Sequence, residues 1–219
     1  MRPPRSADQR VVKLPACRGD APAGLVISQS EAIVFVKRLA VIAEGSQSAF
    51  WSVGACMQVR DAQMEDADDA CLVIRRSITE LCHCDHLGDA STLAMWLANK
   101  TGENMRRWID QNHVIVAIEG KVIIAVGAIR NSGEIMLNYV SPDARFRGVS
   151  KALVERLETI ASELGLPVVT LQSSATARKF YLSAGYTENG PPVKGFGVTF
   201  GYPMAKQLSD RAVETSLRG

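Results

Sequence analysis

The segment most able to do chemistry is a loop between a candidate strand and a candidate helix, within residues 139–151. It contains Arg145, Arg147 and Gly148, and an amphipathic helical pattern begins directly after the glycine. Backbone N–H groups at a helix N-terminus lack intrahelical partners and carry the positive end of the helix dipole, so they suit a phosphate group. The glycine permits close approach, and the arginines add positive charge. These residues alone leave two interpretations open: an anion site, or an ordinary strand–helix loop with solvated arginines.

Two common nucleotide-binding motifs do not fit this loop. A P-loop requires G-x-x-x-x-G-K-[ST], and the sequence has no such run. A dinucleotide-binding fingerprint requires G-x-G-x-x-G after the first strand of a βαβ unit. Gly148 has no such partners and follows a series of candidate antiparallel strands, so both nucleotide-binding folds are weak alternatives.

The loop and a second, independent motif resemble the GNAT superfamily of acyl-CoA-dependent N-acyltransferases. The family signature, Gln/Arg-x-x-Gly-x-Gly/Ala, reads here from Arg145 to Ser150, with Ser150 in place of the usual Gly or Ala. The family's downstream Phe/Leu-Tyr-x-x-x-Gly-Phe/Tyr pattern corresponds to residues 180–186. The resemblance covers residues 57–206. It implies an α+β fold with three layers, in which helices flank a central mixed, mostly antiparallel sheet.

The resemblance also implies acetyl-CoA as co-substrate and gives roles to individual residues. Tyr181 would be the general acid that protonates the departing thiolate, with simple packing of its ring against the sheet as the other interpretation. Ser174 stands where family members often carry an asparagine that touches the cofactor. The strand before the loop would offer terminal backbone groups to the pantetheine arm. The cofactor-binding residues implied in this way are Tyr139, Val140, Arg145, Arg147, Gly148, Val149, Ser150 and Ser174.

A general base for the acceptor amine is not evident from the sequence. Some family members use a glutamate on the central strands, where this chain has Asn138, a side chain that can orient a water but is not a base. Glu134 and Asp143 are the nearest carboxylates in sequence, and we interpret both as solvated surface charges. The fraction of free amine at physiological pH can make a strong base unnecessary.

The elements that must position these residues follow from hydrophobic periodicity and from turn residues. Acidic residues at 65–69 precede a stripe of apolar residues at helical spacing, as is typical of a helix N-terminus. Turns that contain Gly120 and Gly133 separate three strands, which predicts an antiparallel meander. In chain order we expect a strand at 58–62, helices at 65–81 and 91–111 (the latter broken near residues 101–102), strands at 114–118, 122–129 and 134–140, a helix at 149–164, a strand at 168–172, a helix at 175–184, and one or two strands within 194–206.

The run Cys-His-Cys-Asp-His at residues 82–86 has the composition of a metal site. On a helix, however, side chains two positions apart point to different sides, and no second Cys/His pair follows to complete a tetrahedral zinc site. We therefore expect no metal and interpret the run as packing at a helix end.

Composition excludes several classes of protein. The 219 residues carry 25 basic and 23 acidic side chains, and the sequence has no apolar stretch of the length of a membrane span. Residues 1–56 have a net charge of +3 and residues 57–219 a net charge of −1, so we expect no nucleic-acid partner. Five cysteines without framework spacing and the lack of a signal-peptide pattern indicate a cytoplasmic protein.

The sequence divides into three parts. Residues 1–56, marked by prolines, are expected to form a poorly ordered extension with a candidate helix at 30–44, dispensable for catalysis, and Met57 is a candidate translation start. Residues 57–206 would be the acetyltransferase domain, and residues 207–219 a tail.

Two functions compete at this point. The first is an acetyl-CoA-dependent N-acetyltransferase that moves the acetyl group directly to an amine of a small molecule or a protein. The alternative is a catalytically silent, regulatory GNAT-like domain that binds acyl-CoA. The sequence leaves open the acceptor, the acyl-chain preference and whether the chain forms a homodimer.

Overall fold

The structure, a computed structural model, describes residues 56–208. The candidate helix at 30–44, nearly all of the expected extension and nearly all of the expected tail lie outside the described residues. The described elements are β1 (Gln58–Asp61), the 3-10 helix η1 (Met64–Asp66), α2 (Ala67–Leu81), α3 (His83–His86), α4 (Ala90–Leu97), α5 (Gly102–Gln111), β2 (His113–Glu119), β3 (Val122–Ile129), β4 (Glu134–Val140), the 3-10 helix η2 (Pro142–Ala144), α6 (Val149–Glu163), β5 (Val168–Ser173), α7 (Ala175–Ser183), β6 (Thr187–Glu188), β7 (Val193–Lys194) and β8 (Phe200–Gln207).

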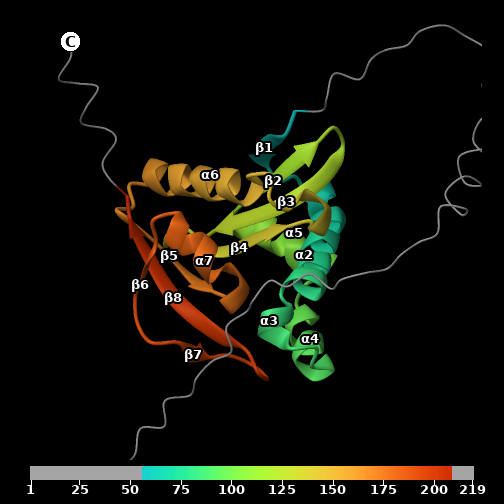
Figure 1. Cartoon of the computed structure of the whole chain (residues 1–219). Helices are drawn as coiled ribbons and strands as arrows, with labels where there is room; N and C mark the ends of the chain where they lie inside the picture. Colours follow the sequence, from blue (N-terminus) through green and yellow to red (C-terminus); the bar gives the residue numbers. More distant parts are fainter. Residues whose placement is uncertain (1–55, 209–219) are drawn as a thin grey trace, which may run out of the picture. The chain divides into compact units, whose positions relative to one another are not determined.

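A single mixed sheet organises these elements (Figure 1). Its strands follow the order β1-β2-β3-β4-β5-β8-β6, and β7 pairs with β8 beside this path. Neighbouring strands are antiparallel except for β4 and β5, which are parallel. A parallel pair needs a crossover connection, and α6 supplies it.

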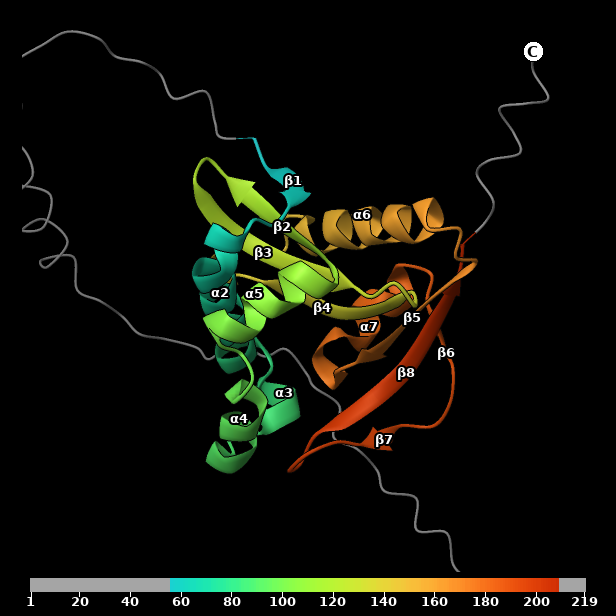
Figure 2. The same cartoon turned by 180° about the vertical axis from the view of Figure 1, so that it is seen from behind.

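Helices cover both faces of the sheet and create two cores. On one face α6 packs through Leu153 and Leu157, both fully buried, against the central strands. On the other face α2 packs through Ile74 and Ile78, also fully buried, together with Met105 of α5. Figure 2 brings α2 and α5 to the front of the sheet. Burial of each such side chain contributes about 1.5–3 kcal/mol, so the two cores hold the strands between them.

Local sequence explains where the central elements begin and end. Asp68 and Asp69 lie in the first turn of α2, where carboxylates favour the helix dipole. Gly120 and Gly133, with φ of 59° and 84°, occupy the left-handed region in the β2–β3 and β3–β4 turns. That region is costly for residues with a Cβ, so these two glycines fix the turns of the meander.

The expected α+β fold with a mostly antiparallel sheet between helical layers is confirmed, including the three-strand meander. Besides the two short 3-10 helices, two elements were not expected. Residues 83–86 form a separate helix, α3, because the chain turns at Cys82 and again at Leu87, whose φ is +51°. The two-residue strand β6 pairs with β8. Among the described residues, no helix has both the length and the apolar character needed to cross a membrane.

Candidate functional site

The site begins where two neighbouring strands of the sheet separate. β4 and β5 are paired at only two positions, Glu134 with Thr170 and Ile135 with Leu171. Beyond these positions β4 continues along β3, whereas β5 continues along β8. The backbone of β4 after Ile135 therefore has no strand partner on the side of β5.

A β-bulge in β4 changes which side chains face the gap. Ile135 is opposite Ile129 and Leu137 is opposite Ala128, so Met136 is an extra residue on the β4 side. Ile135 belongs to the core under α6, and Leu137 belongs to the core under α2, although residues two apart on a regular strand share a face. The bulge thereby turns Asn138 toward α7.

A cavity of about 630 Å³ lies at this separation. Arg145 and Lys151 are its charged lining residues, and no Asp, Glu or His side chain from the described part of the chain lines it. Both cations lie at or next to the N-terminus of α6, so that end of the cavity is positive. Eight of the nine predicted catalytic and cofactor-binding residues line the cavity: Tyr139, Val140, Arg145, Gly148, Val149, Ser150, Ser174 and Tyr181.

The N-terminus of α6 opens into this cavity. Gly148 is the N-cap residue, and no side chain from residues 56–208 accepts a hydrogen bond there. The φ of Gly148 is 78°, and a Cβ built on it would meet no atom within 4 Å. Glycine is thus required by the left-handed backbone, and the space beside it is open to a ligand. The first-turn N–H groups of α6 are available for an anion.

The two arginines of the loop lie in different surroundings. Arg145 lines the cavity, and its guanidinium lies 4.6 Å from the centroid of the Phe146 ring. Arg147 does not line the cavity, because its guanidinium forms an ion pair with Glu119 at the end of β2. Nothing in the sequence was a reason to assign the two arginines different roles. In the structure, Arg145 lines the cavity and Arg147 does not.

Tyr181 lies on α7 with its side chain almost completely buried at the cavity wall. Its hydroxyl accepts a hydrogen bond from Asn138 Nδ2 at 3.2 Å, across the gap between the strands. The Tyr181 ring packs edge-on against Phe180 and Tyr186, at centroid distances of 5.1 and 5.4 Å. Burial raises the pKa of Tyr181 to about 12, and the Asn138 hydrogen bond opposes part of that rise. The hydroxyl therefore stays protonated at neutral pH.

One residue that holds α7 in place was not predicted from the sequence. Asp85 of α3 is buried, and its carboxylate accepts hydrogen bonds from the N–H groups of Ala175 (2.6 Å) and Thr176 (3.2 Å) and from the Thr176 hydroxyl. Ser174, which the resemblance placed near the cofactor, is the N-cap of α7, and its hydroxyl accepts from Ala177 N–H at 3.3 Å. A carboxylate 90 positions away thus caps the helix that carries Tyr181.

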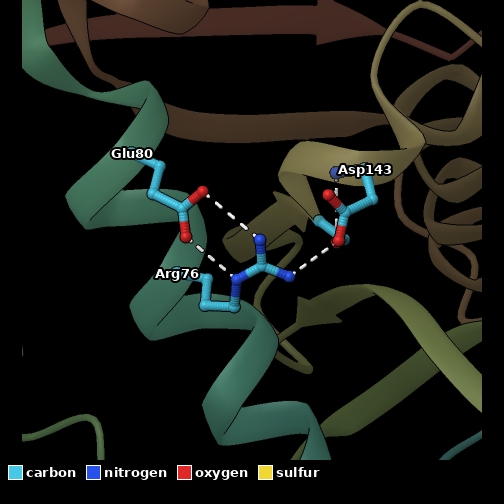
Figure 3. Close-up of polar contacts among 4 residues, drawn as sticks. Arg76, Glu80 and Asp143 are labelled. Atoms are coloured by element: carbon cyan, nitrogen blue, oxygen red, sulfur yellow. Dashed lines mark hydrogen bonds and ion pairs between the residues drawn. The ribbon is translucent and has the colours of Figure 1, made fainter. Parts of the chain in front are cut away.

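The loop before α6 is attached to α2 by an arginine. Arg76 lies between two carboxylates, Glu80 one turn further along α2 and Asp143 in η2 (Figure 3). The Arg76 Nη1–Asp143 Oδ2 distance is 2.8 Å, and this contact lowers the pKa of Asp143. Asp143 is exposed, as expected, but it is ion-paired. Glu134 is likewise paired, with Arg130 at 2.5 Å.

The residues of the Cys-His-Cys-Asp-His run have different surroundings. Cys82 lines the main cavity, and burial raises the pKa of its thiol to about 12. His86 is buried, with Nδ1 accepting from Gly88 N–H at 3.1 Å. Among residues 56–208 no group of three or more His, Cys, Asp or Glu side chains is arranged to hold a metal ion.

Comparisons with solved structures show which fold this is. A GCN5-related N-acetyltransferase from Rhodopseudomonas palustris is 22% identical, with a TM-score of 0.64 over 71% of this chain and 98% of that one. The PaiA N-acetyltransferase of Thermoplasma acidophilum, solved with coenzyme A, is 17% identical, with a TM-score of 0.58 over 70% and 99%. YncA of Salmonella typhimurium, a putative acetyltransferase solved with acetyl-CoA, is 20% identical, with a TM-score of 0.53 over 71% and 96%.

These similarities establish the fold, and a match to a family model establishes the family. The search of curated proteins gives no match. The family model described as the acetyltransferase (GNAT) domain matches residues 88–208, from the turn before α4 to the end of β8. The matched residues include β4, the loop before α6, and α7. The chain therefore belongs to the GNAT family of acetyltransferases.

Proposed function

We propose that this protein is an acetyl-CoA-dependent N-acetyltransferase that moves the acetyl group directly to an amine, with Tyr181 as the general acid. One observation carries the proposal: a single cavity joins the uncapped N-terminus of α6 to the Tyr181 hydroxyl. A thioester on a pyrophosphate-containing arm needs an anion site for the pyrophosphate and a proton donor near the sulfur. This cavity has both, in different parts.

The residues at the α6 end fit a pyrophosphate. The N–H groups of Val149, Ser150 and Lys151 are the first of the helix, and the open space beside Gly148 permits close approach. Arg145 adds a cation without a carboxylate partner among the described residues. Two of the solved GNAT structures hold coenzyme A or acetyl-CoA, which supports the same ligand here.

The free edge of β4 would hold the arm that follows. After Ile135 the β4 backbone is paired on its β3 side alone, so groups around Tyr139 and Val140 can bind the pantetheine amides. Backbone N–H groups at this edge can also polarise the thioester oxygen. Acetyl-CoA supplies the activated acetyl group.

Tyr181 would donate its hydroxyl hydrogen to the departing sulfur. Because Asn138 donates to the Tyr181 oxygen, the phenol O–H is left to point elsewhere in the cavity. Because burial raises the pKa of Tyr181 to about 12, the phenol is protonated when the sulfur develops negative charge, and the phenolate left by proton transfer is basic enough to regain a proton from the acylated amine. The C–S bond breaks as the N–C bond forms. The proton lost by the amine goes to the Tyr181 oxygen and replaces the proton that Tyr181 gave to sulfur.

The amine would enter as the free base. The main cavity has no lining carboxylate or imidazole from the described residues, so these residues supply no general base there. This same feature favours the second candidate, a silent domain that binds acyl-CoA without turnover. The protonated, cavity-lining Tyr181 favours the transferase.

A paired experiment separates the two functions. Isothermal titration with acetyl-CoA is combined with a thiol-release assay over a panel of amines. The transferase proposal predicts saturable binding and amine-dependent thiol release. Binding without release on any acceptor would support the silent domain, and no binding at millimolar acetyl-CoA would contradict both.

A further inference from the structure

A second cavity lies next to the first at the separation of β4 and β5. It has a volume of about 300 Å³ and shares Ile135, Met136, Leu137 and Gln172 with the main cavity. Its other walls come from the turn between α4 and α5, from α5 itself, from the turn between β3 and β4, and from the first residue of β4. A molecule in it would therefore approach the same stretch of β4 that forms one wall of the main cavity.

The charges of this cavity are not balanced. Lys100 and Arg130 are its cations, and Glu134 is its carboxylate. Arg130 is paired with Glu134 at 2.5 Å, whereas Lys100 forms no ion pair with any carboxylate of residues 56–208. The second cavity thus contains one uncompensated positive charge, on Lys100.

The Lys100 ammonium is held in a defined position. Its Nζ lies 2.5 Å from Asn99 Oδ1 and 5.5 Å from the centroid of the Trp108 ring. An ammonium has three N–H donors, so contact with Asn99 leaves two for a ligand. Lys100 is half-buried, and burial lowers its pKa. Desolvation without an anion costs free energy, which a carboxylate at this point would recover.

The backbone that carries Lys100 is anchored independently of its side chain. The Lys100 carbonyl accepts hydrogen bonds from Arg75 Nη1 at 3.1 Å and from the Cys71 thiol at 2.9 Å, both on α2. These contacts fix the backbone from which the Lys100 side chain extends, and the side chain can be changed without removing them.

We propose that the acceptor is a small amine that carries a carboxylate, and that Lys100 binds this carboxylate in the second cavity; this rests on the proposed transferase function. A volume of about 300 Å³ is at the small end of ligand sites, about 300–1,000 Å³, and suits a molecule of amino-acid size. Because both cavities are lined by Met136 and its neighbours on β4, the amine of such a molecule would lie beside the wall of the main cavity.

The test uses matched pairs of acceptors and a matched pair of variants. Thiol release is measured with acetyl-CoA and with L-amino acids, each compared with its own carboxamide, for the full chain, for Lys100→Gln and for Lys194→Gln. Lys194 is exposed on β7 and lines neither cavity. Because the two amines of a pair differ in basicity, the readout is the change between proteins for each acceptor.

For Lys100→Gln we expect KM for the amino acids to rise by about tenfold or more, because one charge-assisted contact with the carboxylate is lost. KM for the carboxamides and for acetyl-CoA should change by less than about twofold. Lys194→Gln should match the unmodified protein, and Lys100→Arg, which keeps the charge, should recover most of the affinity.

Three results would overturn the inference. Turnover of neutral amines with no preference for carboxylates, or an equal effect of Lys100→Gln on both members of each pair, would reject it and leave the transferase function standing. Acetyl-CoA binding without thiol release on any amine would contradict the transferase function and this inference together.

Discussion

Asn138 and Tyr181 are joined by a hydrogen bond of 3.2 Å across the gap between β4 and the segment that follows β5. The bond depends on the bulge at Met136, which turns Asn138 toward α7, and on the burial of Tyr181 at the cavity wall. With its oxygen already accepting from an amide, the Tyr181 hydroxyl is oriented to donate. This pair is the centre of the proposed chemistry, and the predictions below concern the elements around it.

Gly148→Ala should weaken acetyl-CoA binding by about tenfold, because a methyl group would enter the open space beside the first N–H groups of α6. The left-handed φ should also cost about 1–2 kcal/mol of stability. Gly120→Ala is the matched control, since Gly120 also has a positive φ and open space but lies in the β2–β3 turn. Calorimetry on both variants should show similar destabilisation and a loss of affinity for Gly148→Ala alone. Equal affinity in the two would contradict an anion site at α6.

The two loop arginines should differ in their effect on binding. Arg145→Gln removes a cation that lines the cavity, and it should lower acetyl-CoA affinity by about 10–100-fold. Arg147→Gln breaks an exposed ion pair with Glu119 and should change affinity by less than about threefold. Titration calorimetry of both variants at one salt concentration measures this difference. A larger effect of Arg147→Gln would show that Arg147 leaves Glu119 for the ligand.

Asp85→Ala should destabilise the fold and reduce kcat together, because it removes the acceptor for two N–H groups and a hydroxyl at the N-terminus of α7. The expected loss is about 1–3 kcal/mol, measured by urea denaturation. Asp85→Asn, which keeps one acceptor oxygen, should be intermediate. As a control, Asp143→Asn at an exposed pair should leave stability unchanged. A stable Asp85→Ala variant with full kcat would show that α7 does not need this cap.

The pH profile should follow the acceptor. Without a base in the cavity, kcat/KM should rise about tenfold per pH unit up to the pKa of the amine and then level off. No fall should follow below pH 10, because Tyr181, with a pKa of about 12, stays protonated there. The measurement compares two amines of different pKa, because the pH at which kcat/KM levels off should shift with the pKa of the amine. A limb with a fixed pKa near 6–7 for both would indicate a base on the protein.

The elements most open to prediction from sequence were those defined by local signals. The meander followed from Gly120 and Gly133 in its turns, and α6 followed from its apolar periodicity and from Gly148 before it. Tyr181 came from its motif. These patterns lie within a few residues of the features they predict, so they do not depend on the rest of the fold.

The missing features all depend on contacts between distant segments. Asp85 caps a helix 90 positions away, and Glu119 pairs with Arg147 across 28 positions, neither of which has a local sequence signal. The bulge at Met136 depends on the pairing of β4 with β3. Lys100 became a candidate binding residue because it lines a cavity whose carboxylate, Glu134, is paired with Arg130, and only the folded arrangement shows this.

The most direct test of the account is the turnover number of Tyr181→Phe, measured by thiol release at saturating acetyl-CoA and amine. Tyr202→Phe is the control, because Tyr202 is also buried but does not line the cavity. We predict that kcat falls by about 100-fold or more for Tyr181→Phe, that KM for acetyl-CoA stays within about threefold, and that Tyr202→Phe leaves both unchanged. An unchanged kcat for Tyr181→Phe would contradict the role of Tyr181 as the proton donor.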